Sequence, residues 1–178
     1  SNCALPNTSS DQHDFSTFNF SIPAGSTITG ISVAIEGHYD SSSGTNTFCS
    51  FLSYNNGTNW TSGKNTPDVN NTDVTNTLGS VSDTWGRTWA VSDFSNSNFK
   101  LRIMPLVANT TRDAFLDQVT VTVSYNPPNQ VPTAPTQNSP ANGATGVSAS
   151  PTFTMTTTDP DSDKLGFKVT IYSNSGCT

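Results

Sequence analysis

The stretch ISVAIE, residues 31–36, alternates between large apolar side chains and small or polar ones. Ile31, Val33 and Ile35 fall on one side of an extended chain, and the residues between them fall on the other. The stretch VTVTVSY, residues 119–125, repeats this pattern with valines and threonines. A period of two is typical of antiparallel strands that bury one face and solvate the other, so the sequence predicts β-sheet.

Shorter alternating runs predict further strands, at residues 18–22, 47–54, 99–103, 151–155 and 165–171. In the strand over 47–54, Phe48 and Phe51 are expected on opposite faces. Residues 59–77 are polar, and we expect a long loop there with at most one edge strand. Ser92 is predicted to cap a single helical turn.

The composition favours strands and turns over helices. The 178 residues include 28 Thr, 25 Ser and 19 Asn but a single Glu, and no block of helix-forming residues is present. We therefore predict an all-β fold, an antiparallel β-sandwich of the jelly-roll type. A second, incomplete sandwich is predicted after it.

Prolines divide the chain into two parts. Five prolines lie between residues 126 and 140, and this density favours an extended linker. The predicted parts are a sandwich with an N-terminal arm over 1–126, a linker over 127–140 and an incomplete unit over 141–178. Because a sandwich of this kind needs about 80–100 residues, we expect either a fragment of a longer protein or strands supplied by another chain.

Charge and hydropathy exclude several classes of partner. Seven Lys and Arg stand against 13 Asp and Glu, which gives a net charge of −6. An acidic chain with scattered basic residues does not suit nucleic-acid binding. No apolar run approaches the roughly 20 residues that a membrane-spanning helix needs. We predict no nucleic-acid partner and no membrane-spanning segment.

Catalytic signatures are missing from the sequence. Glycoside hydrolysis needs two positioned carboxylates, and with one Glu we find no candidate pair. The motifs of serine hydrolases, zinc proteases and P-loop enzymes do not occur. His13 and His38 have no sequence neighbours that suggest a catalytic triad. The sequence predicts a protein that is not an enzyme and that needs no cofactor, with calcium as the one exception considered below.

Three stretches, in this order, resemble a known module: FNFSIPAGSTITGISV at 18–33, SDTWGRTWAVSDFSNSNF at 82–99 and LDQVTVTVSY at 116–125. They resemble a β-sandwich module of large bacterial and archaeal surface proteins and of phage structural proteins, over residues 14–125. The Trp-Gly-x-Thr-Trp element is the most specific part. Residues 140–172 contain PANGA at 140–144, PTF at 151–153 and DPDSD at 159–163. They resemble the opening of a fibronectin type III or cadherin-like domain, and this resemblance implies that the second, incomplete sandwich is of the immunoglobulin or fibronectin type. These resemblances imply an extracellular structural role and supply no catalytic residues.

The three cysteines, Cys3, Cys49 and Cys177, lack the paired spacing of a zinc site. In an extracellular protein Cys3 and Cys49 can form a disulfide that ties the N-terminal arm to a strand. Cys177 would then be left for a partner further along the chain or in another chain. The alternative is three free thiols.

The tryptophans suggest a sugar-binding platform or a core. Trp85 and Trp89 lie within the module-defining element, where core packing is the first expectation. Trp60 follows an Asn-Gly turn and is the better candidate for exposure. Trp60 with Asn59 is therefore the candidate glycan-binding pair, because flat aromatic faces stack on sugar rings and amides bond their hydroxyls.

Three aspartates, Asp159, Asp161 and Asp163, alternate in one predicted turn. Such carboxylates repel one another unless a cation relieves them, and calcium prefers oxygen ligands. Calcium is therefore a candidate cofactor here. The alternative is a solvated turn beside Lys164, since the spacing is not that of an EF-hand.

Six Asn-x-Ser/Thr sequons occur, at Asn7, Asn19, Asn56, Asn59, Asn70 and Asn109. With 19 Asn and 53 Ser and Thr, composition alone gives about that number, so the count is no evidence for glycosylation. If the sites are used, Asn56, Asn59 and Asn109 are the candidates, because we expect them in accessible loops.

The function predicted first is a non-catalytic extracellular structural or adhesive module of a cell-surface protein. Its sharper form is a self-assembling filament or surface-layer subunit that is completed by strands from a neighbouring chain. The expected partners are copies of the chain or other surface-protein domains, with glycans as a further class. The alternatives are a carbohydrate-binding module of a larger secreted protein and, third, a phage tail or fibre component.

Overall fold

The computed structural model describes residue 3 and residues 11–107 and 111–172. The chain divides into two compact units, Ser1–Pro128 and Asn129–Thr178. Among the described residues, none of the helical segments has the length and hydropathy to cross a bilayer.

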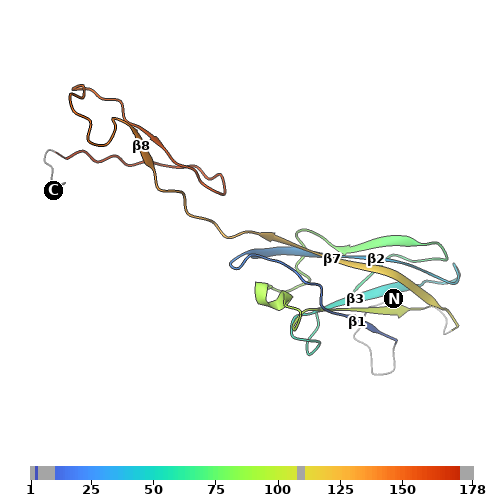
Figure 1. Ribbon diagram of the computed structural model, residues 1–178. Coiled ribbons are helices and arrows are strands. Elements are labelled where there is room, and N and C mark those ends of the chain that lie inside the picture. The colour runs from blue at the N-terminus through green and yellow to red at the C-terminus, as the bar shows by residue number, and fades with distance from the viewer. Residues whose placement is uncertain (1–2, 4–10, 108–110, 173–178) are drawn as a thin grey trace. The chain divides into compact units, whose positions relative to one another are not determined.

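In unit 1 the described residues form two antiparallel sheets (Figure 1). The four-stranded sheet has the order β1 (His13–Phe15), β6 (Lys100–Leu106), β3 (Thr47–Ser53) and β4 (Lys64–Asn65). The three-stranded sheet has the order β5 (Val74–Gly79), β2 (Thr27–Tyr39) and β7 (Ala114–Asn126). The predicted all-β, antiparallel fold is confirmed, and the jelly-roll type stays a prediction.

The core of unit 1 lies between the two sheets. Ile31, Val33 and Ile35 of β2 are buried, as the alternation predicts, and they share one cluster with Leu101 and Ile103 of β6. On β7, side chains at alternate positions pack against the same cluster: Val119, Val121 and Val123. The period of two therefore places the apolar faces of both long strands on one core.

Strand β3 departs from the pattern of one buried and one solvated face. All of its residues are buried. Phe48 belongs to the core between the sheets, whereas Phe51 lies in a second cluster with Cys49 and Met104 on the opposite face. Cys3, Trp60 and Leu106 pack on that second cluster. The prediction that Phe48 and Phe51 point to opposite faces is confirmed.

The strand predicted over residues 18–22 is wrong, because the chain is irregular there. Thr17 and Asn19 have φ values of 62° and 56°, which interrupt an extended backbone. Asn19 is held by Asn96: its backbone N–H donates to Asn96 Oδ1 at 3.0 Å, and Asn96 Nδ2 donates to Asn19 Oδ1 at 2.8 Å. Phe18 and Phe20 still pack on the core. Their alternation therefore reflects burial of the two rings, although the segment does not pair as a strand.

The helical turn predicted near Ser92 is a 3-10 helix, η1 (Val91–Phe94), but Ser92 is not its cap. Ala90 occupies that position, and its backbone N–H donates to Asp93 Oδ2 at 2.9 Å. The Asp93 carboxylate thus accepts a hydrogen bond from a backbone N–H at the start of the helix that has no partner within the helix.

The polar stretch 59–77 holds more strand than the sequence predicts. β4 pairs with β3, and β5 forms an edge of the three-stranded sheet from residue 74 onward. The β5 sequence is rich in threonine and asparagine, and its side chains alone do not indicate a strand. Backbone pairing with β2 holds it extended.

In unit 2 the described residues form one pair of strands, β8 (Thr136–Ser139) and β9 (Thr154–Thr156). β8 lies inside the stretch that the sequence assigns to the linker, because residues 136–139 are free of proline and can pair. The strand predicted over 165–171 is wrong for the described residues, where that segment has no strand partner.

Candidate functional sites

Trp85 and Trp89 are core residues, as predicted, with 3% and 5% of their surface exposed. The indole N–H of Trp85 donates to the backbone oxygen of Ile31 at 2.9 Å, and that of Trp89 donates to the oxygen of Thr84 at 2.8 Å. A buried indole usually finds such a partner. Both rings are therefore structural, and neither offers a face to a ligand.

Arg87, between the two tryptophans in the sequence, contacts Tyr54, Trp89 and Asp93. Its guanidinium lies 3.6 Å from the ring centre of Tyr54 and 4.4 Å from that of Trp89. Nη1 donates to Asp93 Oδ2 at 2.9 Å. Stacking and ion pairing of Arg87 therefore hold the Trp-Gly-Arg-Thr-Trp segment against its aromatic and acidic neighbours.

Cys3 and Cys49 are joined by a disulfide, with their Cα atoms 5.7 Å apart. Cys49 lies on β3, so the bridge ties Cys3 to the outer face of the four-stranded sheet. Cys177 lies outside the described residues.

The candidate glycan-binding pair, Trp60 and Asn59, is only partly available. Trp60 is half-buried, and the guanidinium of Arg102 lies 4.1 Å from its ring centre. Arg102 is itself fixed by Asp14, to which Nε and Nη2 donate at 2.6 and 2.8 Å. Asn59 is exposed. A sugar ring stacking on this face of Trp60 would have to displace a fixed arginine, so these contacts do not support the pair.

Two of the three candidate glycosylation sites lie among the described residues. Asn56 and Asn59 are exposed beside the turn that follows β3. Asn109 lies outside the described residues. Asn56 and Asn59 are therefore accessible to modification, and glycosylation at any of the three positions stays a prediction.

The candidate calcium turn engages two of its three carboxylates with backbone amides. Asp159 Oδ1 accepts the N–H groups of Asp161 and Asp163 at 2.8 and 3.2 Å, and Asp161 accepts the N–H of Gln130. These bonds relieve carboxylate repulsion without an ion. Among the described residues, the three metal-ligand atoms that lie close together belong to a different group, His38, Asp73 and Asp117. Calcium binding here stays a prediction.

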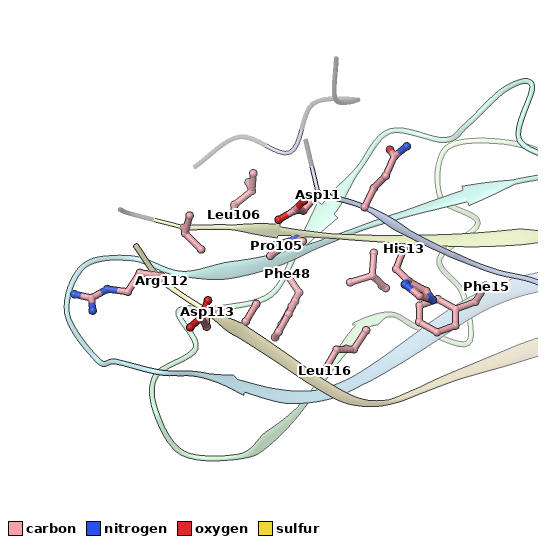
Figure 2. A pocket seen from close by; sticks show the side chains of 13 residues that line it. Asp11, His13, Phe15, Phe48, Pro105, Leu106, Arg112, Asp113 and Leu116 are labelled. Carbon is pink, nitrogen blue, oxygen red and sulfur yellow. The ribbon is translucent and has the colours of Figure 1, made fainter. Parts of the chain in front are cut away.

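An open groove of about 1010 Å³ lies between the edge formed by β1 and β6 and the facing strand β7 (Figure 2). Its floor is the side of the core, with Phe48 and Leu116 between the sheets. Exposed polar side chains from both edges border it: Asp11, His13 and Asp113. These three do not form a group of metal ligands among the described residues. The groove is an opening between sheet edges.

The sequence does not predict the remaining cluster, which lies on the outer face of the three-stranded sheet. His38 on β2 stands beside Asp73, which precedes β5, and Asp117 on β7. His38 Nδ1 lies 3.0 Å from Asp73 Oδ1, and one ligand atom from each of the three residues lies within 4.8 Å of the others. The cluster therefore joins all three strands of the sheet.

The two carboxyl groups of this cluster influence each other. Hydrogen bonding to Asp73 raises the pKa of Asp117, whereas the hydrogen bond with His38 lowers the pKa of Asp73. The protonation of one carboxyl group therefore depends on that of the other.

Known proteins offer no guide to these sites: no protein-family model, curated protein or solved structure matches the chain. The resemblances to surface-protein and fibronectin-like modules therefore stay predictions.

Proposed function

We propose that the chain is a non-catalytic extracellular structural or adhesive module of a cell-surface protein. The observation that carries this proposal is the apolar surface of unit 2. Its described residues pair only two strands, yet large apolar side chains stand between 39% and 74% exposed: Phe153, Phe167, Val169, Ile171 and Tyr172. Side chains of this size normally fill a core, so unit 2 needs further strands to bury them.

The extracellular part of the proposal is supported by the Cys3–Cys49 bridge. Disulfides persist in oxidising compartments and are rare where thiols are kept reduced. The acidic, Thr- and Ser-rich composition is compatible with a solvated surface module, and Trp85 and Trp89 are used for packing rather than for a ligand.

In the sharper form, a neighbouring copy completes unit 2 by strand addition. An added strand gives backbone hydrogen bonds to the open edge, and alternate apolar side chains give specificity. Phe167, Val169 and Ile171 have the required spacing. The arm before Phe15 is a poor donor, because His13–Phe15 already pairs with β6 and Cys3 is bonded to Cys49. We therefore take residues 165–171 as the segment that pairs with the neighbouring copy.

The test is the association state of the full chain. Sedimentation velocity over a concentration series should show reversible self-association. Phe167→Asp combined with Ile171→Asp should abolish it, because two charges would enter the apolar contact. Val81→Asp is the matched control, since Val81 is 71% exposed in unit 1 against 74% for Ile171.

A chain that stays monomeric at every concentration contradicts completion by a neighbouring copy. Association that Val81→Asp disrupts as strongly as the paired change places the contact elsewhere. The broader structural role is tested separately by titrating a glycan panel: saturable binding that Trp60→Ala abolishes would favour the carbohydrate-binding alternative instead.

A further inference from the structure

The outer face of the three-stranded sheet carries an imidazole on β2, a carboxylate on β7 and a second carboxylate just before β5. We propose that His38, Asp73 and Asp117 form a binding site for a divalent first-row transition-metal ion, with Zn²⁺ as the representative ion. This proposal is independent of the strand completion of unit 2.

The ligand chemistry selects this class of ion. Imidazole nitrogen suits zinc and its neighbours in the first transition row, and carboxylate oxygens complete their usual ligand sets. Calcium and magnesium prefer oxygen ligands throughout, so an imidazole at the centre of the group disfavours them. With three protein ligands, a tetrahedral ion keeps one position open to water.

The distances require the ligand side chains to move closer together. Two atoms bound to one tetrahedral zinc ion at about 2.0–2.2 Å lie about 3.3–3.6 Å apart. The ligand atoms of the three residues lie within 4.8 Å of one another. Asp73 is 55% exposed and His38 30% exposed in their side chains, so rotation of the carboxylates can close this gap without moving the strands.

The imidazole is fixed before any ion binds. The ring of His38 stacks on that of Phe115, with centres 4.7 Å apart and planes 9° from parallel. His38 and Phe115 are register partners across β2 and β7. A ligand whose ring is already held loses little rotational freedom on binding.

A β-bulge adds the third ligand. On β7, Leu116 pairs with Gly37 and Gln118 pairs with Glu36, so Asp117 is the extra residue. Leu116 and Val119 pack on the core, and the two residues between them are both exposed. The bulge thus turns one additional side chain to the outer face, next to His38, and bulges re-aim side chains in this way.

Glycine at position 37 permits this backbone approach. A Cβ atom at Gly37 would collide with the backbone oxygen of Phe115. The sheet therefore accepts a bulge that brings Asp117 to a histidine and a second carboxylate. Exposed acids tend to spread apart, because like charges repel, whereas an oxygen of Asp73 and one of Asp117 lie within 4.8 Å of each other.

The experiment is a titration of the full, disulfide-intact chain with ZnCl₂. The protein is first stripped with a chelator and exchanged into a metal-free buffer, and heat is measured by isothermal calorimetry. We expect saturable binding of one ion per chain. Replacing a ligand, in His38→Gln or Asp117→Asn, should weaken binding at least about tenfold.

Two matched variants serve as controls: His13→Gln and Asp11→Asn change the same residue types outside the cluster and should bind zinc as the unaltered chain does. Nitrogen-15 NMR of the imidazoles gives a second readout, because zinc should shift the ring signals of His38 and leave those of His13 in place. Circular dichroism checks that each variant is folded.

Absence of saturable zinc binding overturns the proposal. So does binding that is the same in His38→Gln and Asp117→Asn as in the unaltered chain, or a zinc-dependent shift confined to His13. CaCl₂ at the same concentrations should not displace zinc; displacement by calcium would show that the class of ion is wrong.

Discussion

At the scale of single residues, the buried hydroxyl group of Tyr39 makes stability depend on pH. Tyr39 is fully buried at the end of β2, and its hydroxyl donates to the backbone oxygen of Thr47 at 2.8 Å. Burial raises the pKa of this phenol well above its ordinary value. The bond also joins the last residue of β2 to the first residue of β3 across the core.

Tyr39 therefore predicts a loss of stability in alkali. The unfolded phenol ionises near pH 10, while the folded one keeps its proton to higher pH. The stability that this difference confers is fully present below about pH 10 and is lost as pH rises above it. In Tyr39→Phe, urea denaturation should show a free energy of unfolding about 1 kcal/mol lower at neutral pH and a flatter decline in alkali.

Tyr172→Phe is the control for this prediction, because Tyr172 is 48% exposed. It should follow the unaltered chain at every pH. Parallel alkaline slopes for Tyr39→Phe and the unaltered chain would show that Tyr39 does not carry the effect.

At the scale of the element, β3 is the strand that the alternation pattern describes least well. Its outer face is covered by Cys3 and Trp60, from segments that the sequence shows only as an arm and a loop. The residues of β3 can predict which face each side chain occupies, since the period is two. They cannot predict that both faces are covered, because the cover comes from distant parts of the chain.

The disulfide should contribute substantially to the stability of unit 1. It joins residues 46 positions apart and so removes freedom from the unfolded chain. Cys3→Ser should lower the free energy of unfolding by about 2–4 kcal/mol in chemical denaturation. Reductant should lower the stability of the unaltered chain by a similar amount and leave Cys3→Ser unchanged. Equal stabilities of variant and unaltered chain, both without reductant, would contradict this.

At the scale of the whole molecule, the two units differ in how far their described residues complete a core. Unit 1 buries apolar side chains between two sheets. Unit 2 pairs β8 with β9 and leaves alternating apolar side chains exposed over residues 165–171. The same pattern of residues thus has two outcomes, depending on whether a partner strand is present.

This contrast predicts the pattern of hydrogen exchange. Amides of β3 and β6 should exchange slowly, because both strands are paired within unit 1 and largely buried. Amides of residues 165–171 should exchange fast in dilute protein and more slowly as concentration rises, if copies pair there. Slow exchange over 165–171 at the lowest concentration would contradict an unpaired segment.

The sequence by itself determined the all-β class and the inward faces of the long strands, because alternation and β-branched composition are local properties. The tertiary structure alone decided which distant residues meet. His38 and Asp73 are 35 positions apart and meet through strand pairing, and Asp117 joins them through a bulge. Register and bulges depend on the partner strand, so no pattern within one segment reveals them.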